Sequence, residues 1–110
     1  MQIEHVGLFV KDLDQTVAFY QRFFNASASE LYHNPKTTFS SRFLTFASGA
    51  RLEVCTREDL NLSKLDGYPL GYMHLAVSLG SKEQVDAVSA AITAAGYQHL
   101  SGPRTTGDGY

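Results

Sequence analysis

Two histidines stand at the head of two similar apolar segments, and they are the strongest chemical signal in the chain. His5 begins the segment His-Val-Gly-Leu-Phe-Val, and His74 begins the segment His-Leu-Ala-Val-Ser-Leu. Their offset of 74 − 5 = 69 residues is too long for a solenoid repeat and suits a duplicated supersecondary unit. A duplication with one imidazole at the same point of each copy predicts two ligands directed at one metal ion.

Alternation along the strands predicts that a carboxylate joins the two imidazoles. Successive side chains of a strand point to opposite faces of its sheet. If the apolar residues after each histidine pack against helices, both His5 and His74 face away from those helices. Glu53 lies between Leu52 and Val54, so the same rule turns it away as well. We therefore expect His5, Glu53 and His74 to share one sheet face and to bind a divalent metal ion.

The remaining histidines and the cysteine do not share this pattern. His33 and His99 have no counterpart in the other copy, which predicts surface positions. Cys55 lies on the same face as Glu53 and is predicted to be a small apolar filler. A single cysteine cannot form an intrachain disulfide, which fits a reducing compartment.

Hydrophobic periodicity predicts the elements that position these residues. Alternation over residues 2–10 predicts a strand. Apolar residues at helical spacing then predict a helix over residues 13–24, with Asp12 or Asp14 as its cap and Asn25 as its left-handed end.

Three further strands follow from the same patterns. Residues 39–46 and 50–55 predict the two strands of a hairpin that turns at Ser48-Gly49. Residues 72–79 predict the strand that carries the second histidine.

The second helix is predicted to begin at Ser81, which forms a capping box with Gln84, and to end at Gly96. Residues 97–100 fit one more short strand. The predicted core is Val6, Leu8, Val17, Phe24, Leu44, Leu52, Leu75, Val77, Val88 and Ile92.

Composition describes an ordinary soluble globular domain. The chain has 110 residues, of which 44% are hydrophobic and 18% are charged. A net charge of −2 gives no electrostatic reason to expect nucleic acid or an anionic membrane as a partner. No apolar run approaches the roughly 18 residues of a membrane span, and the chain begins with a strand pattern rather than a signal peptide. We predict one cytoplasmic domain that binds neither nucleic acid nor membrane.

Four motifs carry a resemblance to a known family. The pattern His5-Val6-x-Leu8-x-Val10-x-Asp12-Leu13, followed by Phe19-Tyr20, resembles the opening of the vicinal oxygen chelate superfamily. The segments Gly49–Glu53, Tyr72–Val77 and Pro103–Tyr110 resemble its fourth strand, its fifth strand and the entry to its seventh strand. This superfamily includes glyoxalase I, extradiol dioxygenases, fosfomycin-resistance enzymes, methylmalonyl-CoA epimerase and bleomycin-binding proteins. Within this superfamily, the resemblance implies a glyoxalase I-like member that is truncated at its C-terminal end.

The resemblance implies an α+β fold of tandem βαβββ modules. These form a curved mixed sheet shaped as a cup, with the helices on its convex face and the second module incomplete. It further implies a single glyoxalase-like domain over residues 1–110, with module one at 1–56, a linker at 57–70 and a partial module two at 71–110. Because members of the family pair modules within or between subunits, a homodimer is expected.

The resemblance also implies a chemistry. One divalent ion, zinc or nickel with manganese or iron as alternatives, acts as a Lewis acid on a small oxygen-chelating substrate. Glyoxalase I takes a ligand from the position of Glu53, which predicts Glu53 as both a ligand and the proton-transferring catalytic residue. The implied activity is that of a lyase or isomerase of the lactoylglutathione lyase type, acting on a thiol adduct of a 2-oxoaldehyde. The predicted substrate-binding residues are Phe9, Phe39, Phe43 and Tyr72.

Several alternatives stay open at this stage. One alternative is a non-catalytic binder of the bleomycin type, in which Phe9, Phe39, Phe43 and Tyr72 form an aromatic cup. A second is an extradiol dioxygenase-like enzyme that needs ferrous iron, and a third is a protein that keeps the fold but has lost its metal chemistry. The repeat places the counterpart of Glu53 near 53 + 69 = 122, beyond Tyr110. We therefore expect these 110 residues to bind metal and to turn over substrate poorly. The candidates for holding an anionic part of the substrate are Arg42, Arg51, Arg57 and Arg104.

Overall fold

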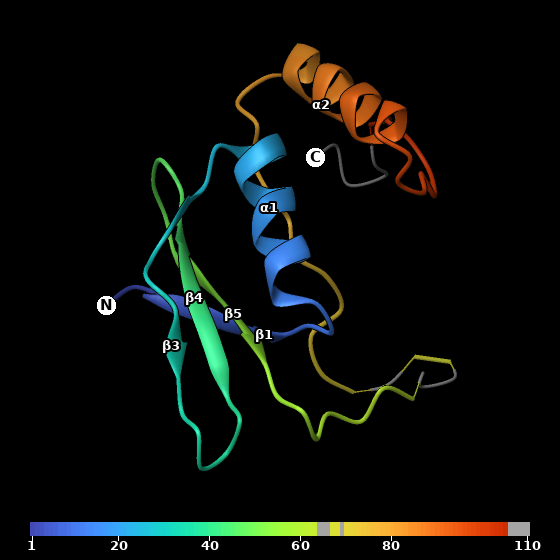
Figure 1. Ribbon diagram of the computed structural model, residues 1–110. Coiled ribbons are helices and arrows are strands. Elements are labelled where there is room, and N and C mark those ends of the chain that lie inside the picture. Colours follow the sequence, from blue (N-terminus) through green and yellow to red (C-terminus); the bar gives the residue numbers. More distant parts are fainter. Residues whose placement is uncertain (64–66, 69, 106–110) are drawn as a thin grey trace. The chain divides into compact units, whose positions relative to one another are not determined.

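The structure is a computed structural model that describes residues 1–63, 67–68 and 70–105. The chain divides into two compact units, Met1–Tyr68 and Pro69–Tyr110, and each is described by itself. The first unit contains the strands and α1, and the second contains α2 (Figure 1). None of the described helices is both long enough and apolar enough to cross a membrane.

The first unit is a mixed five-stranded sheet with one helix. Its strands are β1 (His5–Phe9), β2 (Ser27–Ala28), β3 (Tyr32–His33), β4 (Ser40–Thr45) and β5 (Arg51–Thr56). They are ordered β1-β5-β4-β2, and β3 also pairs with β4. β1 runs parallel to β5, and the other pairs are antiparallel. This order of strand, helix and further strands confirms the predicted α+β class.

Helix α1 (Leu13–Phe24) connects β1 to β2 and has the predicted caps. The Asp12 carboxylate accepts a hydrogen bond from the Gln15 N–H at 2.9 Å, which satisfies one of the free amides at the helix start. Asp14 lies within the first turn instead, where a negative charge is favoured by the helix dipole. Asn25 adopts the left-handed conformation, with a φ of 52°, and ends the helix.

A small apolar core lies between α1 and the sheet. Its buried members are Leu13, Val17, Ala26, Leu44, Leu52 and Val54. Leu44 and Val54 have no exposed surface, while Val6 and Leu8 are half-buried against the same cluster. Phe24, also predicted for the core, is half-buried. Figure 1 shows α1 lying across one face of the sheet, so every second residue of β1 and β5 packs towards the helix, as the alternation predicts.

The second unit is organised around α2 (Lys82–Ala94), whose ends also match the prediction. The Ser81 hydroxyl accepts a hydrogen bond from the Gln84 N–H at 3.2 Å. After the helix, Gly96 has a φ of 95°, and its N–H donates to the Thr93 carbonyl at 3.0 Å. A glycine in this conformation satisfies a terminal carbonyl without the steric cost of a side chain.

The two strands predicted in this half are not formed. Among the described residues, neither 72–79 nor 97–100 belongs to a strand. A strand requires a neighbour that pairs with its N–H and C=O groups, and the described part of this unit contains no such neighbour. Leu75 and Val77, predicted for the core, are 49% and 43% exposed, and α2 contains no buried residue. The predictions for these strands were therefore wrong, and Leu75 and Val77 do not form a core within the described part of this unit.

Candidate functional site

Backbone register brings the strand of His5 beside the strand of Glu53. In the parallel pair of β1 and β5, Gly7 lies opposite Glu53 and His5 lies opposite Arg51. Since paired residues of neighbouring strands point to the same face, the register that turns the apolar residues of β5 to α1 turns His5 and Glu53 away from it. We call this surface the site face. Its members are His5, Gly7, Phe9, Ser41, Phe43, Arg51, Glu53 and Cys55.

His5 and Glu53 are close enough to hold one ion together. The His5 Nε2 atom lies 3.9 Å from the Glu53 Oε1 atom, and the two side chains are 42% and 21% exposed. Two atoms that each lie about 2.1 Å from an ion are at most about 4.2 Å apart, so both atoms can reach the same ion. The structure thus brings together two of the three predicted metal ligands, in a donor set that suits a divalent ion.

Gly7 leaves open space beside this pair. It lies between His5 and Phe9 on the site face, directly opposite Glu53. A methyl group added at Gly7 would meet no atom within 4 Å. Gly7 is not among the glycines with positive φ, so the backbone conformation does not demand a glycine there. Its effect is to leave room next to the Glu53 carboxylate.

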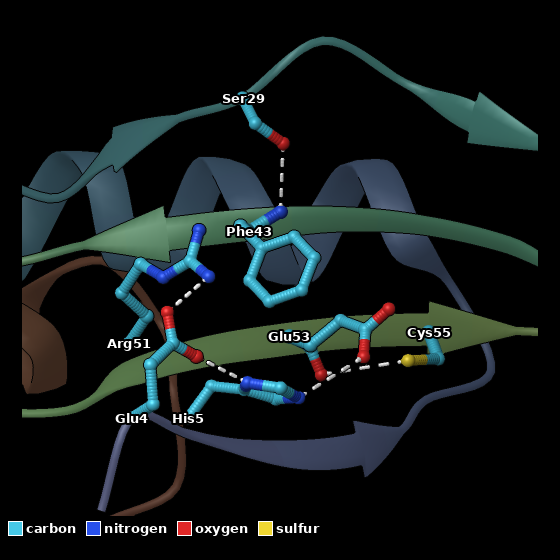
Figure 2. Close-up of polar contacts among 7 residues, drawn as sticks. All are labelled: Glu4, His5, Ser29, Phe43, Arg51, Glu53 and Cys55. Atoms are coloured by element: carbon cyan, nitrogen blue, oxygen red, sulfur yellow. Dashed lines mark hydrogen bonds and ion pairs between the residues drawn. The ribbon is translucent and has the colours of Figure 1, made fainter.

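His5 is held on its other side by a set of contacts shown in Figure 2. Glu4 contacts both the His5 Nδ1 atom and the Arg51 guanidinium group. The Arg51 guanidinium carbon lies 4.2 Å from the centroid of the Phe43 ring. The His5 ring packs edge-on against the same ring, with 5.2 Å between centroids. These contacts fix the plane of the His5 ring and occupy its Nδ1 atom.

The sequence reasoning missed that Glu4 contacts His5 and that Arg51 contacts Glu4. Alternation assigns Glu4 to the face opposite His5, but Glu4 precedes the first residue of β1 and does not follow that rule. Arg51 lies two residues before Glu53 on the same strand, so its place on the site face could have been found from the sequence.

Two titratable groups near the pair have shifted pKa values. The hydrogen bond from His5 and the ion pair with Arg51 hold the pKa of Glu4 below its usual value, so this carboxyl is ionised at neutral pH. Burial raises the pKa of the Cys55 thiol, and the Glu53 charge raises it further. Cys55 is 5% exposed and stays a neutral packed side chain, as predicted.

His74, the third predicted ligand, belongs to the second unit. Among the residues that the structure describes, no group of three or more His, Cys, Asp or Glu side chains is placed to hold a metal ion. His74 as a ligand therefore stays a prediction. His33 and His99 are exposed, as predicted, and they form hydrogen bonds of 2.7 and 2.8 Å with Ser40 and Ser101.

Of the four residues predicted to form the aromatic cup, Phe9 and Phe39 contact each other in the first unit. Phe9 is 56% exposed and packs edge-on against Phe39, with 6.4 Å between centroids. Tyr32 joins them at 6.2 Å from Phe39, and it was missed because a two-residue strand is too short for alternation to be read. The Phe43 ring instead contacts the His5 ring and the Arg51 guanidinium group. Tyr72 lies in the second unit, so its role in the cup stays a prediction.

Three of the candidate arginines already have partners within the first unit. Arg51 pairs with Glu4, Arg57 pairs with a nearby aspartate at 2.7 Å, and Arg42 donates to a backbone carbonyl at 2.8 Å. Next to His5, the charges of Glu4 and Arg51 neutralise each other, and Glu53 adds a negative charge. The local charge therefore favours a cation beside His5 and Glu53.

A cleft of about 630 Å³ lies elsewhere in the first unit. Its lining includes Lys11 and Asp12, just before α1, and Leu31, just before β3, together with Ser40 and Thr56 from the strands. None of its lining residues belongs to the site face, so this cleft is separate from the candidate metal ligands.

The chain matches one protein family over nearly its whole length. The sequence profile of the Glyoxalase/Bleomycin resistance protein/Dioxygenase superfamily matches residues 2–110. The chain belongs to this superfamily, the vicinal oxygen chelate group that its motifs resemble. It is 32% identical over 108 residues to the fosfomycin resistance protein FosX of Listeria monocytogenes, which covers 97% of this chain and 75% of that protein.

Solved structures show the same fold. A variant of Listeria monocytogenes FosX in complex with Mn(II) and 1S,2S-dihydroxypropylphosphonic acid is 29% identical, with a TM-score of 0.67, covering 93% of this chain and 75% of that one. A glyoxylase/bleomycin resistance protein/dioxygenase domain from Frankia is 21% identical, with a TM-score of 0.72 and coverage of 87% and 74%. The trypanothione-dependent glyoxalase I of Leishmania major is 19% identical, with a TM-score of 0.69 and coverage of 91% and 73%. At these identities the last two support the fold alone.

Proposed function

We propose that this chain carries the metal site of a divalent-metal-dependent vicinal oxygen chelate enzyme, with His5, Glu53 and His74 as protein ligands. The observation that carries the proposal is the 3.9 Å between His5 Nε2 and Glu53 Oε1, beside the open space at Gly7. The Mn(II) in the structure of the FosX relative supports it. Manganese is therefore the first metal to test, and zinc, nickel and iron suit the same ligand types.

The residues of the site face have distinct roles in this proposal. The ion supplies Lewis-acid stabilisation of negative charge on substrate oxygens. His5 provides its Nε2 atom as a ligand. Glu53 provides a second ligand and accepts a proton from a group bound in the space at Gly7. Phe9 and Phe39 contact the apolar part of a small substrate.

The first substrate class to test is an epoxide that carries a phosphonate. The FosX relative was solved with a vicinal diol of propylphosphonic acid. Such a diol is the product of adding water to an epoxide. The water oxygen bonds to one ring carbon and gives up one of its protons, that carbon's bond to the ring oxygen breaks, and the ring oxygen takes up a proton. The phosphonate and the neighbouring oxygen give such a substrate two atoms with which to chelate the ion.

A second candidate is the glyoxalase reaction on a thiol adduct of a 2-oxoaldehyde. The nearness of Glu53 to His5 favours it, because glyoxalase I is expected to use a glutamate ligand from this strand. Glu53 would then move a proton between neighbouring carbons of the substrate.

The test is metal binding followed by a direct comparison of the two substrates. The purified chain is titrated with Mn(II), observed by electron paramagnetic resonance, and is then assayed by ³¹P NMR with an epoxypropylphosphonate and by absorbance with the thiol adduct. We expect Mn(II) binding that EDTA reverses and that Glu53→Gln weakens, with Glu30→Gln, a change of another glutamate in the same unit, as the matched control. A chain that binds no divalent ion, or a Glu53→Gln variant that binds as well as the parent chain, contradicts the proposal.

We also propose that the chain forms a homodimer. Among the strands that the structure describes, β1 lies at an edge of the sheet, and the N–H and C=O groups on its outer side can pair with another chain. Sedimentation across a range of concentrations checks this, and a monomer mass throughout contradicts it.

A further inference from the structure

The contact between Glu4 and His5 determines which nitrogen of His5 carries the proton. An ionised carboxylate has only acceptor atoms, so the His5 Nδ1 atom must donate in its hydrogen bond to Glu4. In a neutral imidazole the proton is then on Nδ1, and Nε2 carries a lone pair. That lone pair lies on the side of Glu53 Oε1, 3.9 Å away. An imidazole lone pair and a carboxylate oxygen placed in this way are two donor atoms prepared for one cation.

Glu4 is itself held in place by Arg51. One Glu4 oxygen contacts His5, and the other contacts the Arg51 guanidinium group. The Arg51 N–H also donates to the Glu4 carbonyl at 2.9 Å, which joins the two backbones. Arg51 lies over Phe43, and His5 packs against the same ring (Figure 2). Glu4, Arg51 and Phe43 thus form a closed ring of contacts with His5.

Stability alone is a poor explanation for this arrangement. The Glu4 and Arg51 side chains are 57% and 38% exposed. Ion pairs with this much exposure contribute little to folding, because water and salt screen them. What the contacts do change is the orientation and the protonation site of His5, which lies at the candidate metal site.

We propose that Glu4 is a positioning residue that holds His5 with its Nδ1–H bonded and its Nε2 free to bind metal, and that Arg51 holds Glu4 rather than an anionic substrate. The metal-binding part of this inference rests on the proposed function, whereas the protonation of His5 does not. A carboxylate that orients a metal-binding histidine typically changes metal affinity about 10- to 100-fold when it is removed.

The experiment reads the His5 tautomer in the metal-free 110-residue chain. Long-range ¹H–¹⁵N correlation spectra, recorded where the imidazole is neutral, distinguish Nδ1–H from Nε2–H, and His5→Gln assigns the signal. We expect the Nδ1–H form in the parent chain and a shift towards Nε2–H in Glu4→Ala. Glu4→Gln keeps an oxygen acceptor and is expected to retain the Nδ1–H form in part. Glu30→Ala, at an exposed glutamate of the same unit, is the matched control.

Mn(II) titration of the same variants separates this inference from the proposed function. We expect Glu4→Ala to weaken Mn(II) binding about 10- to 100-fold and Glu4→Gln to weaken it less. An unchanged tautomer in Glu4→Ala overturns the positioning role, even if the parent chain binds Mn(II). A shifted tautomer in a chain that binds no Mn(II) supports the positioning role and contradicts the proposed function.

Discussion

The two faces of the sheet in the first unit carry different kinds of residues on the same strands. On the face against α1, Leu44 and Val54 are fully buried. On the site face, β5 presents Arg51 and Glu53, which are partly exposed and make polar contacts. Since side chains alternate with a period of two, one strand can contribute to the core on one face and to a ligand site on the other. Substitutions on the two faces should therefore affect stability and metal binding separately.

The largest expected effect is on the helix side of the sheet. Leu44→Ala leaves a cavity in a fully buried position and should lower the free energy of unfolding of the first unit by about 2–5 kcal/mol. Phe9→Ala, on the site face and 56% exposed, should lower it by much less. Urea unfolding followed by circular dichroism measures both. Equal decreases in the free energy of unfolding would mean that residues of the site face contribute to the core as much as Leu44 does.

The second effect tests the site face. His5→Ala should weaken Mn(II) binding on the order of 100-fold, about 2.7 kcal/mol, because it removes one ligand of the candidate ion. The urea midpoint should change little, since the His5 side chain is 42% exposed. His33→Ala, at an exposed histidine of the same unit, is the control and should leave Mn(II) binding unchanged. If the two histidine variants bind alike, the site face does not hold the metal.

A smaller effect concerns the cap that sets the start of α1. Asp12→Ala removes the acceptor for the Gln15 N–H and should cost about 1 kcal/mol of unfolding free energy. Asp14→Ala removes only a favourable charge in the first turn and should cost less. Neither change should alter Mn(II) affinity, as measured in the same titration. A change in affinity would show that the helix side and the site face are coupled.

The smallest effect is a pH dependence on the helix side. Burial raises the pKa of Tyr20 above its ordinary value of 10.0, and its ring packs 6.2 Å from that of Phe46. As pH rises, the unfolded chain therefore loses the Tyr20 phenol proton at a lower pH than the folded chain does. The contribution of Tyr20 to stability is complete below pH 10 and declines as pH rises towards the pKa of the folded state. Urea midpoints between pH 9 and 11 should fall more steeply for the parent chain than for Tyr20→Phe. Parallel pH profiles would contradict the assigned shift.

Interactions between near neighbours in the sequence could be predicted well. Asp12 and Asn25 begin and end α1 as predicted, because a helix cap depends on residues within about one turn. The same holds for Ser81 at the start of α2. The faces of His5 and Glu53 also follow from local alternation, since the direction of a strand side chain depends only on its position in the strand.

Pairing between distant segments was decided by the tertiary structure. The amino-acid sequence by itself assigned His5 and His74 the same apolar pattern, yet β1 pairs with β5, while residues 72–79 form no strand among the described residues. Likewise, only the parallel register of β1 and β5 places Gly7 opposite Glu53 and brings Arg51 within reach of Glu4. A periodic pattern determines which face a side chain occupies, but a strand and its register also require a partner whose hydrogen-bonding groups match, and that partner can lie anywhere in the chain.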